Sequence, residues 1–563
     1  MSNLCVNIAK LLYKRGIRNI CISPGLRNSA ISLAFINHGK FNCHSIIDER
    51  SAAYFGVGLA LKTHHPTVLI CTSGTAVANY FPAIIEASQS RIPLIVITAD
   101  RPVELLNSGE NQTIHQKNIY GDFVRMAIDI NMNDESNTML SDINNSLKFI
   151  DCRNKGIVIG PIHINIHLND FTAISTTKKF NVFNKSINRM TVNKFNWMMI
   201  PYEDVFSLYT RKRPLIIIGR LSQKLNKKLI NQLSNHLNAP ILADSLSQMR
   251  FDNKKSLSFY DHYIDNINMQ PDLIIRIGQK PVSKKLCRQI ELWEGNNNKM
   301  DFSSLLIDDA NRFNDDCTTV IPCKYEDFIN VMVNSTPKNI SNDFYNYIIN
   351  LDSKVHSILN DGNNDWSELN ISKLCLASMS NNENLFIGNS MPIRYIDMIG
   401  KLNHNININT YSNRGASGID GIVATALGIS KISNKRNLLL IGDLSFIYDQ
   451  SSLLIAKQYN IDLTIVIINN NGGGIFSQLP ASNLINKKML NTYWTTPHNI
   501  DLKKIAQLYD FQYTKVNNTQ KLNTVLAKYK KQSGIKIIDA VIDINSNKKI
   551  LKKLKNRIKK GTV

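Results

Sequence analysis

The sequence predicts an α/β protein of three domains, each a doubly wound parallel sheet with helices on both faces. Two observations predict this fold: short apolar segments alternate with amphipathic segments, and turn residues follow the apolar segments. A third is the length of 563 residues, which exceeds what one core organises and suits two to four domains. We place the domains at residues 1–182, 183–345 and 346–563.

Four apolar segments in each domain are expected to form strands. In the first domain they are NICISPG, HSIIDE, TVLICTSG and PLIVITADRP, after an opening segment with helical rather than signal-peptide character. The central domain follows a mostly polar stretch at residues 178–196 and contributes RPLIIIGR, APILADS, PDLIIRIG and SSLLIDD. The last domain follows the Asn- and Asp-rich stretch 360–365 and contributes NLFIGNS, LLLIGDLSF, LTIVIINN and IIDAVIDI.

The net charge of +22 is spread along the chain, with one dense basic run at residues 548–560. Within this run Ile550, Leu551, Leu554 and Ile558 recur at helical spacing, which predicts a terminal helix with one apolar stripe. We interpret its charges as a solvated helix face rather than a contact with RNA or a membrane. Neither nucleic acid nor a membrane is therefore an expected partner.

The cysteines and the hydropathy pattern bear on the compartment. The nine cysteines include no CxxC pair and no zinc spacing, which is typical of thiols in a reducing compartment. No apolar run approaches the ~18 residues that span a bilayer. The expected location is the cytoplasm, or the plastid stroma if the gene is plastid-encoded.

The strongest local signal is GDLSF followed by NNNGGG. Asp443 ends one apolar strand and Asn470 ends the next, 27 positions later, with the helical segment DQSSLLIAKQYN between them. In a right-handed βαβ unit both strand ends lie at one edge of the sheet. A carboxylate and an amide oxygen are hard ligands for Mg²⁺, which in turn bridges a diphosphate, and the carbonyl of Gly472 is a candidate third ligand.

Either half of this signal alone would favour a helix cap or an Asn-Gly turn. Together they resemble the thiamine-diphosphate signature, in which GD precedes NN by roughly 25 to 30 residues. Neither a G-x-G-x-x-G with an acidic ribose partner nor a G-x-x-x-x-G-K-[ST] is present, so a nucleotide enzyme is disfavoured.

Thiamine chemistry also needs a carboxylate at N1′ of the aminopyrimidine ring. The candidate is Glu49 in IIDERSAAYFGVGLA, at the end of a strand and the start of a helix of small and apolar residues. This setting would desolvate the carboxyl group and raise its pKa. A helix-terminal charge is the alternative, and it would be preferred if Glu49 stood alone. The diphosphate signal elsewhere in the chain favours the catalytic interpretation.

Nine segments between residues 23 and 498 resemble one family, the 2-succinyl-5-enolpyruvyl-6-hydroxy-3-cyclohexene-1-carboxylate (SEPHCHC) synthases of menaquinone biosynthesis. They are SPGLRNSAI, DERSAAYFGVGLA, TSGTAVANYFPAIIEASQSRIPLIVITADRPVELLNSGENQTI, GPIHIN, GNSMPIR, SNRGASGIDG, GDLSF, NNNGGGIFSQLP and TPH. TADRP with ENQTI, and NRGASGIDG, separate this family from acetolactate synthases and pyruvate decarboxylases.

The resemblance implies an N-terminal pyrimidine-binding domain, a central domain and a C-terminal diphosphate-binding domain. It implies thiamine diphosphate with Mg²⁺ or Mn²⁺, held between two subunits of a homodimer or a dimer of dimers. The implied reaction decarboxylates 2-oxoglutarate and adds the succinyl-semialdehyde carbanion to isochorismate, giving SEPHCHC and carbon dioxide on the way to menaquinone or phylloquinone.

The resemblance also implies the residues of the site. Both substrates are dianions, which suits cationic side chains and arginine above all. The implied substrate contacts are Arg27, Arg101, Asn111, Gln112, Lys284, Lys285, Ser390, Arg394 and Arg414. Besides Glu49, Asp443, Asn470 and Gly472, the implied cofactor contacts are Ser390 and an apolar wall of Ile419, Ile475 and Phe476. For any one arginine, a surface salt bridge is the alternative.

The sequence departs from the family pattern at three positions. Leu26 stands where the family has Ser in SPGSR, which removes a possible hydrogen bond to substrate. Lys285 stands where Arg is common, which removes bidentate geometry. His115 replaces Asp in NQTIDQ, and we interpret it as a neutral residue at a helix start rather than a catalyst.

Three other functions remain open at this point. They are a thiamine-dependent carboligase with a different acceptor, a catalytically dead scaffold paralogue, and nucleic-acid binding by the basic C-terminal run.

Overall fold

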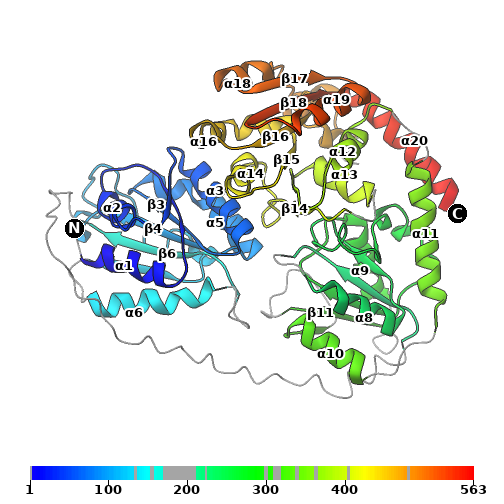
Figure 1. Ribbon diagram of the computed structural model, residues 1–563, viewed down its shortest axis with the longest axis horizontal. Helices are drawn as coiled ribbons and strands as arrows, with labels where there is room; N and C mark the ends of the chain where they lie inside the picture. The colour runs from blue at the N-terminus through cyan, green and yellow to red at the C-terminus, as the bar shows by residue number, and fades with distance from the viewer. Residues whose placement is uncertain are drawn as a thin grey trace. The chain divides into compact units, whose positions relative to one another are not determined.

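The computed structural model describes residues 3–131, 136–151, 158–168, 211–221, 225–296, 302–308, 319–335, 341–360, 365–401, 406–478, 482 and 484–562. The chain divides into two compact units, residues 1–198 and 199–563. The first unit contains one six-stranded sheet and the second contains two, and all the strand pairs within them are parallel (Figure 1). The predicted α/β class with three parallel sheets is confirmed.

The first unit is a sheet in the order β2-β1-β3-β4-β6-β5. Its strands are β1 (Asn19–Ile22), β2 (Asn42–Ser45), β3 (Thr67–Cys71), β4 (Leu94–Asp100), β5 (Ala127–Asn131) and β6 (Ile162–His167). Its helices are α1 (Asn3–Lys14), α2 (Ser29–Asn37), α3 (Glu49–Thr63), α4 (Thr75–Asn79), α5 (Phe81–Ser90) and α6 (Ser136–Ser146), with 3-10 turns η1 (Val103–Leu105), η2 (Gly121–Phe123) and η3 (Leu147–Phe149). Helices α1 and α6 cover one face of the sheet, and α3 and α5 cover the other.

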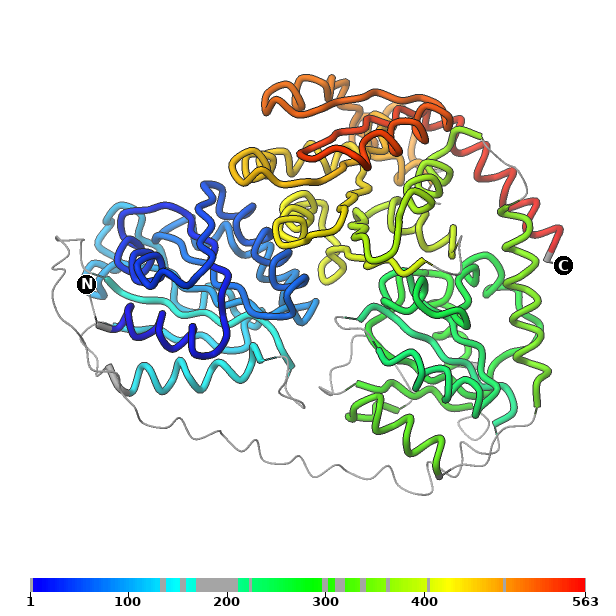
Figure 2. Tube along the Cα trace, viewed as in Figure 1, coloured from blue at the N-terminus to red at the C-terminus, as the bar shows by residue number. Residues whose placement is uncertain are grey.

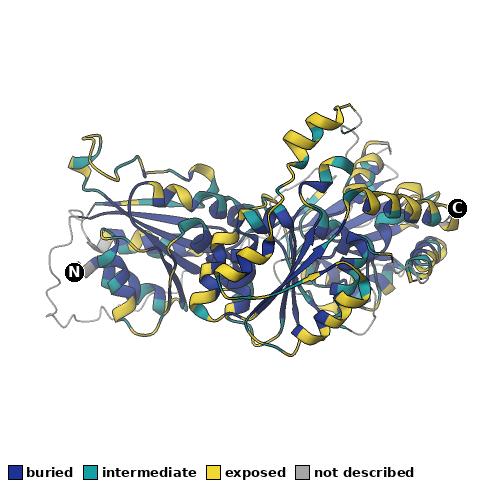
Figure 3. Cartoon of the chain, turned by 90° about the horizontal axis from the view of Figure 1, so that it is seen from above, coloured by how far each residue is buried: buried dark blue, intermediate teal, exposed yellow. Residues whose placement is uncertain are grey.

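The strands of the first unit are apolar on both faces because helices cover both. Every residue of β1, β3, β4 and β6 is buried, as the dark blue strands of Figure 3 show. Val- and Ile-rich runs without alternation are typical of such sheets. The helix that begins at Glu49 has residues 51–60 buried throughout, as its small and apolar composition predicts.

The central part of the second unit has the strand order β12-β11-β10-β7-β8-β9. Its strands are β7 (Pro214–Ile218), β8 (Ile241–Ala243), β9 (Ser256–Leu257), β10 (Leu273–Ile277), β11 (Ser303–Ile307) and β12 (Thr319–Ile321). Its helices are α8 (Lys227–Leu237), α9 (Lys284–Asn296) and α10 (Tyr325–Ser335), with 3-10 turns η4 (Tyr260–His262) and η5 (Ile264–Asn266).

The C-terminal part of the second unit has the strand order β14-β13-β15-β16-β18-β17. Its strands are β13 (Asn384–Ile387), β14 (Asn409–Tyr411), β15 (Asn437–Gly442), β16 (Leu463–Asn469), β17 (Gln512–Val516) and β18 (Ile535–Val541). Its longer helices are α11 (Asp343–Asn360), α12 (Glu368–Ala377), α13 (Met391–Ile399), α14 (Ile422–Lys431), α19 (Thr519–Tyr529) and α20 (Ile544–Thr562). Its shorter helical segments are α15 (Asp443–Tyr448), η6 (Gln450–Ser452), α16 (Leu453–Tyr459), η7 (Gly474–Gln478), α17 (Lys487–Leu490), η9 (Asn491–Thr495) and α18 (Leu502–Leu508).

A buried ion pair joins the two sheets of the second unit. The guanidinium of Arg250 donates to a side-chain oxygen of Asp397 at 2.6 Å and to its backbone carbonyl at 2.8 Å. Both side chains are buried, and Tyr260 accepts a further hydrogen bond from Arg250 at 2.8 Å. One continuous apolar core also includes residues of both sheets. The two parts of this unit therefore pack as one body.

The last helix, α20, lies beside α11, as the red and green segments of Figure 2 show. Leu551, Leu554 and Ile558 are buried, while the lysines around them are exposed. The predicted terminal helix with one apolar stripe is confirmed.

The twelve predicted strand segments all contain or adjoin a strand. The segment HSIIDE is shifted: its strand β2 ends at Ser45, so the two isoleucines after it lie outside the strand. Strands β5, β6, β9, β12, β14 and β17 were not predicted; β9, β12 and β14 are two or three residues long. The predicted domain boundary at 182/183 lies outside the described residues, and the one at 345/346 falls in the first turn of α11, so both boundaries stay predictions.

Candidate active site

Asp443 stands where β15 ends and α15 begins. Its side chain is 2% exposed and accepts hydrogen bonds from the backbone N–H groups of Leu444 at 2.7 Å and Gly472 at 2.9 Å. Burial raises the pKa of Asp443, and these two hydrogen bonds oppose that shift. A buried carboxylate held by two backbone donors is oriented for one further ligand.

Asn470 follows β16, the strand that pairs directly with β15. Its side-chain NH₂ donates to Glu368 Oε1 at 2.8 Å, while its Oδ1 is buried and accepts no hydrogen bond among the described residues. An unpaired buried oxygen costs about 1–3 kcal/mol unless a ligand satisfies it. This oxygen fits the predicted cation ligand.

At Gly472 the glycine turn packs closely against the segment that precedes α18. Its φ is +147°, and a Cβ built on it would lie 2.2 Å from the carbonyl oxygen of Thr495, so only glycine fits. The same carbonyl accepts from the N–H of Gly473 at 2.7 Å. The carbonyl of Gly472, the predicted third ligand, accepts from Gly474 at 3.0 Å and retains a second lone pair.

Two residues that hold these ligands were not predicted from the sequence. His498, in the TPH segment, lies with Nε2 3.3 Å from Asp443 Oδ2, and its Nδ1 accepts from the N–H of Ile500 at 2.9 Å, so the proton belongs on Nε2. Glu368 is 1% exposed and binds Asn470, and Tyr395 donates to its other oxygen at 2.7 Å. Burial raises the pKa of Glu368, against the hydrogen bonds from Asn470 and Tyr395.

Neither residue had a usable signal in the sequence. Glu368 opens a helix, where an acidic residue is common, and His498 belongs to a motif quoted only for its resemblance. Among the described residues no group of three or more His, Cys, Asp or Glu side chains could hold a metal ion. The proposed site contains only one such side chain, the carboxylate of Asp443. Its other ligands would be an amide oxygen and a backbone carbonyl, and this combination suits Mg²⁺ or Mn²⁺.

The predicted apolar wall lies on two segments of the second unit. Ile475 and Phe476 belong to η7, directly after the glycine turn, and Ile419 lies in the loop before α14. Within the chain alone Ile419 is 41% exposed and Phe476 is 37% exposed. Large apolar side chains exposed beside a polar ligand site are typical of a surface that a ligand or partner covers.

A cavity of about 230 Å³ in the second unit gathers four of the predicted residues, Lys284, Lys285, Arg394 and Ile475. Lys284 and Lys285 begin α9, so the N-terminal end of this helix also faces the cavity. Lys285 pairs with Asp265 at 2.9 Å, at an exposed position. The structure thus brings the predicted basic pair of the central domain to an arginine and an apolar residue of the C-terminal domain.

Arg394, Arg414 and Ser390 lie around the start of α13. Arg394 donates to the carbonyl of Ser390 at 2.9 Å, and Arg414 donates to the side-chain oxygen of Asn389 at 3.2 Å. Burial lowers the pKa of Arg394, and the positive charge of Arg414 lowers it further. Ser390 has φ +69°, a conformation that is costly for a residue other than glycine. Two neighbouring guanidinium groups in a strained turn favour a bound anion.

In the first unit Glu49 is the first residue of α3, and Asp48 caps this helix by accepting from the N–H of Ser51 at 3.2 Å. Glu49 is half-buried. Burial raises the pKa of Cys71, at the end of β3, and the charge of Glu49 raises it further.

The remaining predicted contacts lie on loops of the first unit. Arg27 donates to the carbonyl of Leu168 at 2.7 Å, and Arg101 donates twice to the carbonyl of Asn111, at 2.6 and 3.1 Å. Asn111 and Gln112 are exposed, and Gln112 packs against the turn at Gly74, where a Cβ would lie 3.3 Å from its Cα. The structure therefore joins the TADRP, ENQTI and TSG segments.

The other two departures, Leu26 and His115, lie in the first unit. Leu26 is 76% exposed. His115 is exposed in an irregular segment, and the next helical element is η2, so the interpretation of His115 as a helix-start residue is wrong. The ENQTI segment turns back toward Gly74 there, and the hydrogen bond from the Gly74 N–H to Gln116 at 2.9 Å fixes that turn instead of a helix.

A buried polar network below these loops was missed by the sequence reasoning. His167 lies 2.5 Å from the carbonyl of Arg101 through Nδ1 and 3.1 Å from Asp129 through Nε2. The hydrogen bond with Asp129 raises the pKa of His167. Gln116 donates to Asn165 at 2.9 Å. These residues fix the backbone that carries Arg101. Asp129, Asn165 and His167 lie on strands, and the pattern of a strand reveals burial but not partners.

One negative finding concerns the membrane: within the described residues, no helix combines the length and the apolar character that crossing a bilayer needs.

Comparison with known proteins gives three family models that match the chain. The thiamine pyrophosphate enzyme N-terminal TPP binding domain matches residues 4–119, the middle domain of thiamine pyrophosphate matches residues 184–387, and the C-terminal TPP binding domain matches residues 400–540.

Similar sequences carry one name. The 2-succinyl-5-enolpyruvyl-6-hydroxy-3-cyclohexene-1-carboxylate synthase of Bacillus pumilus (strain SAFR-032) is 32% identical over 548 residues, which cover 94% of this chain and 93% of the relative. The synthases of Staphylococcus haemolyticus (strain JCSC1435) and Staphylococcus aureus (strain MRSA252) are 33% and 34% identical, covering 90% and 91% of this chain and 89% of each relative.

Among solved structures, benzoylformate decarboxylase from Polynucleobacter necessarius superposes with a TM-score of 0.73. The superposition covers 97% of this chain and 99% of that structure, at 15% identity. At this identity the likeness shows the fold alone.

Proposed function

This chain belongs to the SEPHCHC synthase family of thiamine-diphosphate enzymes, and on that premise we propose that it joins 2-oxoglutarate to isochorismate with loss of carbon dioxide. The product is SEPHCHC, an intermediate of menaquinone or phylloquinone biosynthesis. The observation that carries the proposal is the pair of ligands at adjacent strand ends, where Asn470 presents a buried oxygen without a partner among the described residues.

Asp443, Asn470 and the carbonyl of Gly472 would hold Mg²⁺ or Mn²⁺, which would bind the diphosphate. His498 orients Asp443, and Glu368 orients Asn470, through the hydrogen bonds given above. When bound, the cofactor supplies the electron sink that a 2-oxo acid needs in order to lose carbon dioxide. Glu49 would hold a proton at N1′ of the aminopyrimidine ring, as the catalytic carboxylate.

Cationic side chains support dicarboxylate substrates. Arg394 and Arg414 lie close enough to lower the pKa of Arg394, and a carboxylate between them would relieve that repulsion. Lys284 and Lys285 face the same cavity as Arg394. In the first unit, the substrate contacts would be Arg27, Arg101, Asn111 and Gln112, with Ser390 of the second unit as a polar contact near the cofactor.

Ile419, Ile475 and Phe476 would pack against the cofactor and exclude water from the reacting atoms. Exclusion of water protects a carbanion equivalent from protonation. The exposure of Ile419 and Phe476 in the chain alone supports this role, because their apolar area is available for a ligand.

The oligomeric state and the cellular location are proposals as well. We propose a homodimer or dimer of dimers, in which Glu49 of one subunit and Asp443 of another meet one cofactor. The cytoplasm or a plastid stroma is the proposed location, and neither nucleic acid nor a membrane is a proposed partner.

The test is release of carbon dioxide by the purified enzyme loaded with thiamine diphosphate and Mg²⁺. Release from 2-oxoglutarate with isochorismate, and not from pyruvate under the same conditions, is expected. Release that is equal with pyruvate, or that ignores isochorismate, would indicate a carboligase with a different acceptor. No release with either acid would indicate a scaffold protein.

A further inference from the structure

The cavity that holds the predicted basic pair has a wall that no sequence motif predicted. Helix α20, from the basic C-terminal run, contributes Leu551 and Lys555 to the lining. The other walls come from the start of α9, from α13 and from η7, which directly follows the glycine turn. The C-terminal helix therefore lies at a substrate cavity rather than only in solvent.

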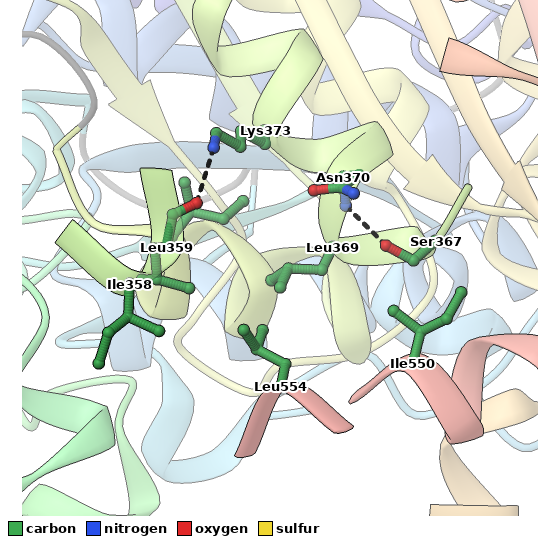
Figure 4. A pocket seen from close by; sticks show the side chains of 9 residues that line it. Ile358, Leu359, Ser367, Leu369, Asn370, Lys373, Ile550 and Leu554 are labelled. Carbon is green, nitrogen blue, oxygen red and sulfur yellow. Dashed lines mark hydrogen bonds between the residues drawn. The ribbon is translucent and has the colours of Figure 1, made fainter. Parts of the chain in front are cut away.

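The apolar stripe of α20 fixes this placement. Figure 4 shows Leu554 of α20 facing Leu369 of α12, with Ile358 of α11 on one side of this pocket and Ile550 of α20 on the other. Leu554 is 6% exposed and Leu551 is 7% exposed, and Leu551 lines the cavity. Residues four apart share one face of a helix, so the anchoring of Leu551 carries Lys555 to the same cavity.

A second observation places Lys555 close to the basic pair. The imidazole of His262 is hydrogen-bonded to the carbonyl of Met398, on the cavity wall, at 2.9 Å. Burial lowers the pKa of His262, Asp261 and this hydrogen bond oppose the shift, and the charges of Lys285 and Lys555 lower it further. Both ammonium groups are therefore within electrostatic range of one side chain at the cavity.

The charges around the cavity do not balance. Its cations are Lys284, Lys285, Arg394 and Lys555, and its acids are Asp261 and Asp397. Asp397 is paired with Arg250, and Asp261 accepts a hydrogen bond from Ser283 at 2.5 Å. Within the described residues neither Lys284 nor Lys555 forms an ion pair. The excess positive charge suits a ligand with two carboxylates.

The proposed reaction indicates which dicarboxylate would bind in the cavity. The donor loses one of its two carboxylates as carbon dioxide before the acceptor reacts, whereas the acceptor keeps both of its carboxylates throughout. One of these carboxylates is attached to the ring and the other to the enolpyruvyl side chain, so cations on separate elements of the protein can bind them.

We infer that Lys555 of α20 binds a carboxylate of the acceptor isochorismate, opposite the cations of α9 and α13, and so helps to select a dicarboxylate acceptor. The inference rests on the proposed function for the identity of the ligand. It assigns to the basic C-terminal helix a role in substrate binding.

The test compares Lys555→Gln with Lys553→Gln in the full-length enzyme loaded with thiamine diphosphate and Mg²⁺. Lys553 is exposed on the same helix and does not line the cavity. Its substitution therefore removes the same charge as Lys555→Gln without removing a side chain from the cavity. For Lys555→Gln we expect the KM for isochorismate to rise about tenfold, with the KM for 2-oxoglutarate changed less than about twofold. Lys555→Arg should recover most of the loss, and Lys553→Gln should behave as the wild type.

Calorimetric titration of isochorismate into the loaded enzyme, without 2-oxoglutarate, separates this inference from the proposed function. If the wild type binds isochorismate but releases no carbon dioxide, the proposed function fails. The binding constants of the variants then still test whether Lys555 contributes to isochorismate binding. Equal binding by the two glutamine variants, or a rise in the KM for 2-oxoglutarate instead, would overturn the inference. A wild type that binds no isochorismate overturns both.

Discussion

Asn470 donates a 2.8 Å hydrogen bond to Glu368, and the oxygen of the same amide group is buried without a partner among the described residues. The two residues are 102 positions apart in the sequence. The hydrogen bond to Glu368 thus fixes the orientation of the Asn470 amide, so that its oxygen and not its NH₂ group is left for a cation.

From this follows a prediction for Glu368→Ala. Loss of the acceptor would free the Asn470 amide to rotate, and the affinity for Mg²⁺ should fall about 10- to 100-fold, as with other residues that orient metal ligands. The affinity is measured by the Mg²⁺ dependence of the thermal unfolding temperature in the presence of thiamine diphosphate. Glu368→Gln keeps an acceptor oxygen and should lose much less. An unchanged Mg²⁺ dependence in Glu368→Ala would contradict the role of this contact.

The raised pKa of Asp443 predicts a dependence on pH. The pKa of Asp443 is higher in the folded protein than in the unfolded chain. Its protonated side chain therefore stabilises the metal-free fold at pH values below the unfolded pKa. This stabilisation is lost as the pH rises through the folded pKa. Asp443→Asn should therefore raise the unfolding temperature of the metal-free protein at neutral pH, by roughly 2–4 °C. With Mg²⁺ and thiamine diphosphate the order should reverse, because only the wild type gains a ligand.

The control for this prediction is Asp510→Asn, at a side chain that is 82% exposed, which should shift the unfolding temperature by less than about 1 °C. Thermal scans across acidic and neutral pH measure both variants. A metal-free Asp443→Asn protein less stable than the wild type at neutral pH would refute the expected sign.

The proposed sharing of each site between two subunits predicts complementation. Glu49→Gln and Asp443→Asn should each be inactive as homodimers, because each removes a group from every site. Mixed after dissociation and reassembly, half of the dimers should be hybrids with one intact site of two, which gives about a quarter of the wild-type activity. Mixing Glu49→Gln with Glu49→Ala is the control and should restore nothing. Absence of recovery in verified hybrids would show that Glu49 and Asp443 act within one chain.

The Arg250–Asp397 pair predicts a large loss of stability. Both side chains are almost fully buried, so Arg250→Ala leaves an unpaired acid in the core and should lower the free energy of unfolding by about 3–5 kcal/mol. Arg213→Ala removes an exposed ion pair with Asp272 and should cost less than about 1 kcal/mol. Denaturant titration of both variants measures the difference, and equal losses would disprove the structural role of the buried pair.

The meeting of Asp443 and Asn470, the proposed metal ligands, at adjacent strand ends could be predicted because their positions are local consequences of the chain. Asp443 and Asn470 each end an apolar run, and parallel strands joined by one helix bring such ends together. The long buried strands were predictable for the same reason, since uninterrupted apolar runs leave few alternatives.

Other features depend on packing between distant segments. Glu368, His498 and Lys555 have ordinary surface patterns, and only their tertiary neighbours distinguish them. Strand β9 has two residues, too few for a periodic signal. His115 was placed at a helix start because nothing local revealed that Gln116 would bind Gly74 instead.

The glycine turn beside Asn470 has one more consequence. The N–H of Gly473 binds the carbonyl of Thr495, and a Cβ at Gly473 would lie 2.8 Å from the carbonyl oxygen of Trp494. Trp494, which is 37% exposed, is thus tied by its own backbone to the loop that carries Asn470 and Gly472, two of the proposed cation ligands. Its fluorescence should follow occupancy of that loop, which gives the protein a built-in optical reporter of cofactor loading.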